Sequence, residues 1–249
     1  MKKYLNKLIL KLKKIFSKRK NIFIATIIFI ILLVIIIILI FGKNDSKKFT
    51  LNRIYEVYPE DVRKLYSNVV DVSCNGDLHF DIKLDSGEKK IEDINKNDLL
   101  NYMFSYLDKD NLLTDKIEKS LFEKTEKELF LDKVNLIDNI KDYNYNGYIY
   151  NVNKGIITRK KGECNSGDIK YVSHLFGYSY NKKELSIDIN VAYLKDGILY
   201  NYSDEQLGEY NGDVSKLFKL TKNTSYYRLN YVKRNGIYKL SSIEWKSRT

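Results

Sequence analysis

The hydrophobic pattern divides the chain into two parts. From Ile22 to Phe41 the chain holds twenty residues without a charge, and Thr26 is the one polar side chain among them. At about 1.5 Å per residue in a helix, such a run spans about 30 Å, which matches the hydrocarbon core of a bilayer. A helix on the surface of a globular protein needs a polar face toward water, and this run offers none. The pattern therefore predicts a transmembrane helix over 22–41.

Three segments in the second part of the chain repeat apolar residues at the spacing of a helix. The first begins at Pro59, a residue that suits the first turn of a helix, and the second covers Asn97–Leu107. The third begins after Thr114 as its N-cap and ends at about Phe130. The inward-facing residues of these predicted helices are Val62, Leu65, Tyr66, Val69, Val70, Leu99, Leu100, Met103, Phe104, Ile117, Leu121, Phe122 and Leu129.

Alternating apolar and polar residues predict antiparallel strands in the remainder of this part. The clearest alternation covers three runs, Leu78–Leu84, Leu185–Tyr193 and Tyr227–Val232. Dipeptides that suit the type I′ turn of a hairpin lie between apolar runs at Asn146-Gly147, Asp196-Gly197 and Asn235-Gly236.

Helices followed by hairpin-linked strands predict an α+β domain in which three N-terminal helices pack on one face of a curved antiparallel sheet. This order of elements resembles, in layout only, that of cystatin-like and NTF2-like domains. With a single proline and no Gly/Ser-rich tract, residues 51–249 form one expected domain, joined to the apolar run by a linker at 42–50. Nine linker residues reach at most about 30 Å, so the domain is expected to work close to the membrane.

Charge sets the orientation of the apolar run. Residues 1–21 carry nine basic side chains and no acidic one, since the first acidic residue is Asp45. The positive-inside rule then places this tail in the cytoplasm and Thr249 outside the membrane. The run ends in Phe41-Gly42-Lys43-Asn44-Asp45, which has no small-x-small cleavage site, so we expect an uncleaved signal anchor of a cell-membrane protein. The nine basic residues are Lys2, Lys3, Lys7, Lys11, Lys13, Lys14, Lys18, Arg19 and Lys20.

The tail also carries apolar residues at helical spacing, namely Leu5, Leu8, Leu12, Ile15 and Phe16. This pattern is typical of a basic amphipathic helix lying on an anionic inner leaflet, and it fits a simple charge cluster that fixes topology equally well. The chain beyond the tail carries 34 basic and 32 acidic residues. Because a nucleic-acid-binding domain needs a large basic surface, this near balance predicts no nucleic-acid partner.

The two cysteines of the chain, Cys74 and Cys164, both follow the apolar run. Outside the cytoplasm a pair of thiols tends to oxidise. Closing a loop of about 90 residues contributes about 4–5 kcal/mol in the chain-entropy model. We expect a disulfide whose Cα atoms lie within about 7 Å; two buried, unpaired thiols are the alternative.

His79 and Asp81 form an H-x-D pair on one face of a predicted strand, and His174 is the only other histidine. Two imidazoles and one carboxylate are a ligand set for Zn²⁺ or Fe²⁺. However, His174 shares a side of its own run with Val172 and Phe176, which places it on the apolar layer, opposite to His79. We therefore expect the two imidazoles to lie more than about 8 Å apart, too far for one ion.

The residues Asp142-x-Asn144-x-Asn146-Gly147 fit the start of a calcium-binding loop, although Asn153 stands where that loop needs a bidentate Glu. The same residues fit an ordinary hairpin turn. The sequence contains no nucleophile elbow, no Gly-rich phosphate loop and no C-x-x-C motif.

The short linker, together with the lack of a complete set of catalytic residues in the sequence, predicts a non-enzymatic envelope protein. Its outer domain is expected to bind another envelope protein or a wall component beside the membrane, without a cofactor. One alternative is a membrane-anchored metal-dependent hydrolase or other enzyme that uses His79, Asp81 and His174. Another alternative is a membrane signalling protein or a scaffold subunit of a secretion machine.

Overall fold

The computed structural model of the chain describes residues 58–70, 72, 74–82, 87–164 and 168–247, and these belong to one compact unit, Phe49–Thr249. The expected tail, apolar run and linker lie outside the described residues. Within the described ranges, no helix has both the length and the apolar character needed to cross a membrane.

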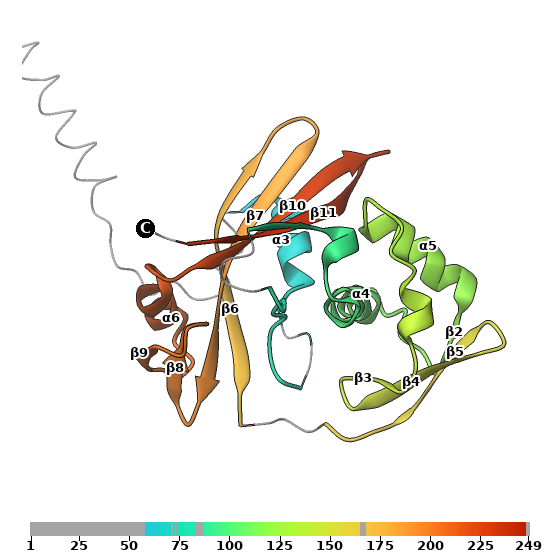
Figure 1. The fold of residues 1–249 in the computed structure, drawn as a ribbon, viewed down its shortest axis with the longest axis horizontal. Helices are drawn as coiled ribbons and strands as arrows, with labels where there is room; N and C mark the ends of the chain where they lie inside the picture. The colour runs from blue at the N-terminus through green and yellow to red at the C-terminus, as the bar shows by residue number, and fades with distance from the viewer. Residues whose placement is uncertain (1–57, 71, 73, 83–86, 165–167, 248–249) are drawn as a thin grey trace, which may run out of the picture. The chain divides into compact units, whose positions relative to one another are not determined.

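The described residues form four α-helices and two antiparallel sheets, so the α+β class is confirmed (Figure 1). The helices are α3 (Glu60–Ser67), α4 (Lys96–Lys109), α5 (Lys119–Leu129) and α6 (Val214–Thr221). The seven-stranded sheet has the order β1-β11-β10-β7-β8-β9, and β6 pairs with β7. Its strands are β1 (Glu88–Lys90), β6 (Lys170–Tyr180), β7 (Glu184–Lys195), β8 (Ile198–Tyr200), β9 (Gln206–Glu209), β10 (Tyr226–Arg234) and β11 (Ile237–Lys246). The four-stranded sheet has the order β2-β5-β4-β3 and consists of β2 (Lys116–Glu118), β5 (Ile156–Lys161), β4 (Tyr148–Asn153) and β3 (Tyr143–Tyr145).

Helix α4 lies between the two sheets and forms the centre of the core (Figure 1). On one side, the Tyr102 hydroxyl lies 3.2 Å from the Tyr231 hydroxyl of β10. On the other side, the Phe104 ring packs against Tyr143 at 5.1 Å and against Tyr150 at 4.6 Å. A helix that is apolar on two faces needs a partner on each. The prediction of helices on a single sheet was therefore incomplete, because the four-stranded sheet covers the second face of α4.

The predicted helices are present, with one shifted start. Helices α3 and α4 match the expected segments, but α5 begins at Lys119 instead of directly after Thr114. The intervening residues form β2, in which Ile117 pairs with Ile157 of β5. Thr114 does not cap the helix, because its hydroxyl donates to the Lys116 carbonyl at 2.6 Å. Tertiary pairing thus overrides the helical periodicity in this segment.

The strand predicted over Leu78–Leu84 is wrong for the residues described, since 77–82 form an irregular segment, which we call the strap. The alternation of burial is nevertheless as expected, with Leu78, Phe80 and Ile82 at 3, 1 and 5% exposed. Individual hydrogen bonds hold the strap in place, and it does not pair with a neighbouring strand. The Leu78 amide donates to the Val69 carbonyl at 2.7 Å, and the hydroxyl of Tyr227 donates to the Phe80 carbonyl at 2.7 Å.

The other predicted strands and all three predicted turns are confirmed. Strands β7 and β10 cover the two runs of alternation, and they pair with each other. The three dipeptides connect β3 to β4, β7 to β8 and β10 to β11. Both residues of each turn have positive φ, as a type I′ turn requires: Asn146 49°, Gly147 73°, Asp196 51°, Gly197 78°, Asn235 52° and Gly236 84°.

Helix α6 was not predicted, and it covers part of the sheet face that the alternation assigned to water. Its N-cap is Asp213, whose carboxylate accepts from the Ser215 amide at 2.8 Å. Below the helix, Ala192 of β7 is 1% exposed, and the amide group of Asn190 donates to the Thr221 carbonyl at 3.1 Å. The even-numbered residues of β7 are therefore buried at this end of the strand.

Candidate functional site

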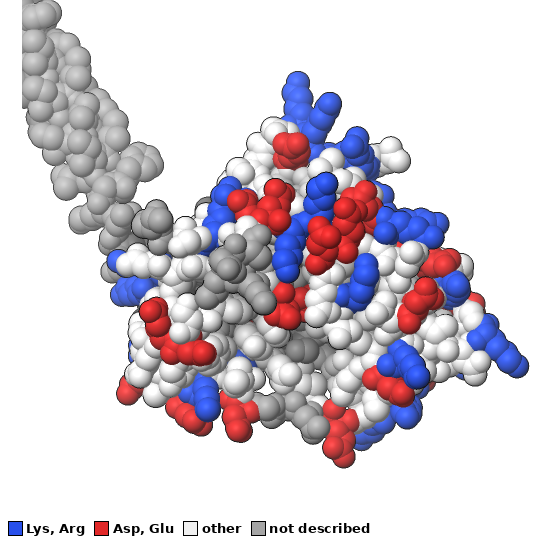
Figure 2. All heavy atoms as spheres, viewed as in Figure 1, with Lys and Arg blue, Asp and Glu red and all other residues white. Residues whose placement is uncertain are grey.

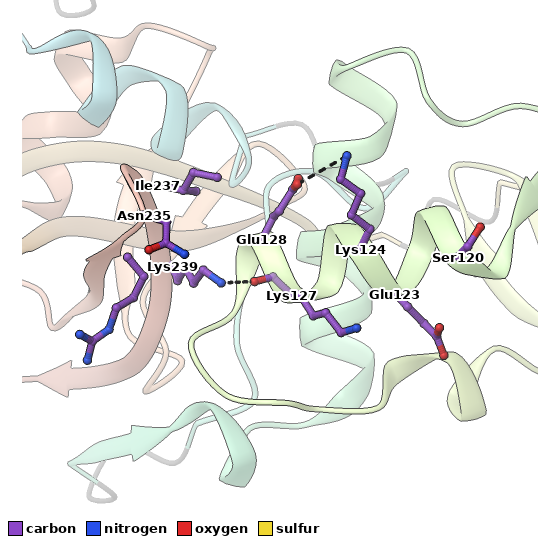
Figure 3. A pocket seen from close by; sticks show the side chains of 9 residues that line it. Ser120, Glu123, Lys124, Lys127, Glu128, Asn235, Ile237 and Lys239 are labelled. Atoms are coloured by element: carbon purple, nitrogen blue, oxygen red, sulfur yellow. Dashed lines mark hydrogen bonds and ion pairs between the residues drawn. The ribbon is translucent and has the colours of Figure 1, made fainter.

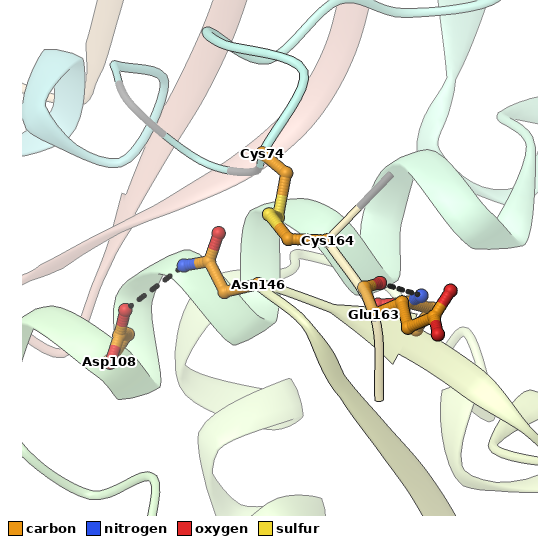
Figure 4. The surroundings of a disulfide bond; sticks show 6 residues. Cys74, Asp108, Asn146, Glu163 and Cys164 are labelled. Atoms are coloured by element: carbon orange, nitrogen blue, oxygen red, sulfur yellow. Dashed lines mark hydrogen bonds between the residues drawn. A yellow bond between two sulfur atoms is a disulfide. The ribbon is translucent and has the colours of Figure 1, made fainter. Parts of the chain in front are cut away.

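A disulfide joins Cys74 to Cys164, with Cα atoms 5.7 Å apart, and confirms the predicted pairing (Figure 4). Cys74 lies in the segment that follows α3, and Cys164 follows β5. Close to this bond, the side-chain amide of Asn144 donates to the Glu163 carbonyl at 3.2 Å. The disulfide thus ties the segment beside β6 to the four-stranded sheet.

The structure separates the two histidines of the suggested metal site. The His79 ring stacks on Tyr171, with ring centroids 3.7 Å apart, and Tyr171 packs on the large core cluster. His174 is 4% exposed, and its Nε2 lies 2.5 Å from the Thr221 hydroxyl of α6. Because residues 171 and 174 have opposite parity on β6, the two imidazoles lie on opposite faces of that strand. Among the residues described, no three His, Cys, Asp or Glu side chains are arranged to hold a metal ion.

The environment of His79 also shifts the pKa of its imidazole. Burial lowers the pKa of His79, and the nearby charge of Asp81 opposes that effect in part. Asp81 itself is exposed, and its backbone amide is bound to Asp98. His79 and Asp81 are therefore residues of the strap that help to attach it to the core.

The residues of the suggested calcium loop serve the β3–β4 hairpin. The Asp142 carboxylate accepts from the side chain of Asn151 at 3.1 Å, and Asn144 donates to the Glu163 carbonyl. Figure 4 shows the Asn146 amide directed toward Asp108, whose carboxylate lies 3.5 Å away. The three side chains thus bond to three different partners. Asn144 and Asn146 do so through their NH₂ groups, which are hydrogen-bond donors and cannot be ligands of a cation.

A pocket of about 150 Å³ lies between α3, β6 and α6. Within it, the Asp77 carboxylate accepts from both the backbone amide and the hydroxyl of Ser173, each at 2.7 Å. The Tyr66 hydroxyl lies 3.3 Å from the same Ser173 hydroxyl. The Asp77 carboxylate thereby fastens the strap to β6, and the pocket lies beside this attachment.

Asp98 is a buried carboxyl group that the sequence analysis did not single out. It stands in the first turn of α4, is 7% exposed, and accepts from the Asp81 amide at 2.8 Å. Burial raises the pKa of Asp98 to about 6, while the bond from Asp81 and the charge of Lys89 act in the opposite direction. The sequence marks Asp98 only as an acidic residue in the first turn of a helix capped by Asn95, a common and favourable position that does not indicate burial.

A second, larger hollow is the groove between α5 and the β10–β11 hairpin, with a volume of about 480 Å³ (Figure 3). Helix α5 turns Phe122, Glu126 and Leu129 inward, which leaves its charged side facing the groove. The groove is lined from α5 by Ser120, Glu123, Lys124, Lys127 and Glu128, and from the hairpin by Arg234, Asn235, Ile237 and Lys239.

Two sets of bonds fix the walls of this groove. The Leu131 amide donates to the Leu240 carbonyl at 2.9 Å, which attaches the end of α5 to β11. The Glu126 carboxylate accepts from three successive backbone amides, at residues 134–136, and so holds the turn after the helix. Figure 3 shows Lys239 reaching from the hairpin to the Lys127 carbonyl on α5. The groove is therefore a fixed feature of the core packing.

The groove carries four basic and two acidic side chains. Both acids have a basic neighbour on α5, since Glu128 lies 3.9 Å from Lys124 and Glu123 lies 3.7 Å from Lys119. Lys127 and Arg234 form no ion pair with any described residue. The lining thus presents an excess of positive charge to a ligand.

Comparison of the chain with models of protein families, with curated proteins and with solved structures finds no match.

Proposed function

We propose that this chain is a single-pass membrane protein whose outer domain is a non-enzymatic binding module that acts close to the membrane. Its partner is another envelope protein or a wall component. The charge-free run Ile22–Phe41 and the basic tail before it support the anchor and the orientation. The disulfide Cys74–Cys164 supports an oxidising compartment outside the cytoplasm.

The observation that carries the binding role is the groove between α5 and the β10–β11 hairpin. It is open to solvent, its walls are fixed by backbone bonds, and its lining consists mostly of Lys, Arg and Glu side chains. Ser120 is the one hydroxyl side chain in the lining, which contains no histidine that could activate it. This composition favours the recognition of a charged ligand over nucleophilic chemistry. The metal-dependent alternative loses support because His79 and His174 occupy opposite faces of β6.

Photocrosslinking in the full-length, membrane-inserted chain tests this proposal, and the fold supplies a matched control. Ile237 follows the Asn235-Gly236 turn at the groove, and Phe218 of α6, outside the groove lining, has the same exposed fraction of 46%. A photoreactive side chain at Ile237 is expected to yield a crosslinked product. The same side chain at Phe218 is expected to yield none. Equal products at both sites, or none at Ile237, would contradict a binding role for the groove.

A further inference from the structure

Basic side chains continue beyond the groove onto the neighbouring hairpin. The turn between β6 and β7 carries Lys182 and Lys183, both exposed. The Lys233 amide of β10 donates to the Lys183 carbonyl at 2.6 Å, which holds the two hairpin ends together. Figure 2 shows basic side chains over the projecting ends of these hairpins. We call the combined set the basic surface: Lys124, Lys127, Lys182, Lys183, Lys233, Arg234 and Lys239.

The basic surface is a local concentration of charge. Beside its seven basic residues lie three acidic ones, Glu123 and Glu128 in the groove and Glu184 next to Lys183 in the chain. The other acids of the same elements are engaged elsewhere, Glu126 by backbone amides, Asp188 by Arg228 and Glu244 by Lys246. The basic surface's excess of four positive charges is larger than the excess of two for the whole chain beyond residue 21. The near balance of charge counted along the sequence therefore conceals an uneven distribution in space. A concentrated field of this kind attracts anions and raises their rate of association.

The chemistry of the surface indicates what kind of anion fits. Ile237 is the one aliphatic side chain among the groove residues, which include no aromatic ring. A protein partner is normally held by buried aromatic and aliphatic anchors, and this lining offers few. Lys side chains bind phosphate as point charges, and the Arg fork binds it through paired hydrogen bonds.

The extent of the surface indicates the size of the ligand. Its cations come from α5, from the β10–β11 hairpin and from the β6–β7 turn. A single small anion contacts only a few such side chains, whereas a chain of linked anionic groups contacts many of them in succession. We propose that the groove and the basic surface bind a wall component, a linear polymer that carries phosphate groups. This inference rests on the proposed binding function and names the chemical class of the ligand.

Lysine-labelling footprints on the full-length chain test the proposal with linear polyphosphate as the probe. A local readout is needed because the nine basic residues of the tail attract any polyanion. Saturating polyphosphate is expected to slow the acylation of Lys127 and Lys183 at least fivefold. Labelling of the control residues Lys160 and Lys195, both exposed and neither part of the groove lining, is expected to change less than twofold.

A charge reversal sharpens the test. Arg234→Glu is expected to raise the polyphosphate concentration that protects Lys127 at least tenfold, whereas Lys160→Glu, with the same change in net charge, leaves it unchanged. Equal protection of Lys127 and Lys160 would overturn the proposal, and so would equal effects of the two reversals. Protection by poly-glutamate or by anionic lipid vesicles as strong as that by polyphosphate would assign the surface to carboxylates or to lipid headgroups instead.

The footprint tests the phosphate polymer as the ligand, and the crosslink tests the binding role of the groove. A crosslink at Ile237 without a footprint leaves the binding module in place and refutes the phosphate polymer as its ligand. Absence of both the crosslink at Ile237 and the footprint refutes the groove as a binding site.

Discussion

The buried carboxyl group of Asp98 gives the fold a specific dependence on pH. Its ordinary pKa is 3.8, and burial raises the pKa to about 6 in the folded chain. At 1.36 kcal/mol per pKa unit, this difference corresponds to about 3 kcal/mol. Because the folded state holds the proton more tightly, the stabilising contribution is complete below about pH 4. It is lost as the pH rises to about 6, and above that pH the buried charge lowers the free energy of unfolding.

The substitution Asp98→Asn removes this charge and retains an oxygen that accepts from the Asp81 amide. At pH 7.5 the variant is expected to be more stable than the natural chain by about 1–3 kcal/mol. The lower figure applies if the new amide group lacks a buried acceptor, which costs about 1–2 kcal/mol. At pH 4 Asp98 is neutral in the folded chain and only partly ionised in the unfolded chain, so most of this advantage disappears. The change in the stability difference between the two pH values is therefore about 2–3 kcal/mol.

Urea unfolding of the full-length chain in detergent measures this difference. Trp245 is the single tryptophan, and it packs against Tyr227 at 4.6 Å, so its fluorescence reports loss of the core. The exposed residue Asp132 provides the control substitution Asp132→Asn, for which we expect no difference between pH 4 and pH 7.5. If Asp98→Asn destabilises the chain equally at both pH values, the reasoning is refuted and Asp98 acts only as a hydrogen-bond acceptor.

Three further predictions follow from the sequence and the fold. A reporter that works only outside the cytoplasm should be active when fused after Thr249, and activity of a cytoplasm-only reporter there would reverse the topology. Removing the disulfide by the paired change Cys74→Ser and Cys164→Ser should lower the free energy of unfolding by about 4–5 kcal/mol in the chain-entropy model, measured by urea unfolding; an unchanged midpoint would exclude a structural role. Tyr102→Phe should cost about 1–2 kcal/mol because the buried Tyr231 hydroxyl loses its partner at 3.2 Å. Tyr231→Phe should cost less, because the Tyr102 hydroxyl keeps its second hydrogen bond, to Asn68. The double variant should cost less than the sum of the two, and strict additivity would argue against this bond.

The features that the sequence predicted correctly depend on neighbouring residues. The turns at Asn146-Gly147, Asp196-Gly197 and Asn235-Gly236 need only two residues that tolerate positive φ between two apolar runs. Helix α4 needs only its own periodicity and the Asn95 cap. The disulfide was also accessible, because the chain contains one pair of cysteines and no choice of partner.

The features that the sequence missed depend on contacts between distant segments. The strap has the alternation of a strand, but its amides and carbonyls bond to Val69, Asp98 and Tyr227 instead of a neighbouring strand. The residues of β2 have the periodicity of a helix, yet Ile117 pairs with Ile157 of β5. Helix α6 has eight residues, as α3 does, but no proline marks its start in the way that Pro59 marks the start of α3. Alternation and periodicity describe which side chains are buried, and they do not specify which backbone groups pair.

The groove shows the same limit at the level of the site. Along the sequence, the Lys and Glu residues of α5 form an ordinary solvated helix face, and Arg234 and Lys239 flank an ordinary hairpin turn. The site forms only where the end of α5 is attached to the edge of β11, through the bond from Leu131 to Leu240. That attachment brings together two charged walls that the sequence separates by about a hundred residues. A count of charges gives their sum and cannot give their position, so the basic surface becomes apparent only when the chain is folded.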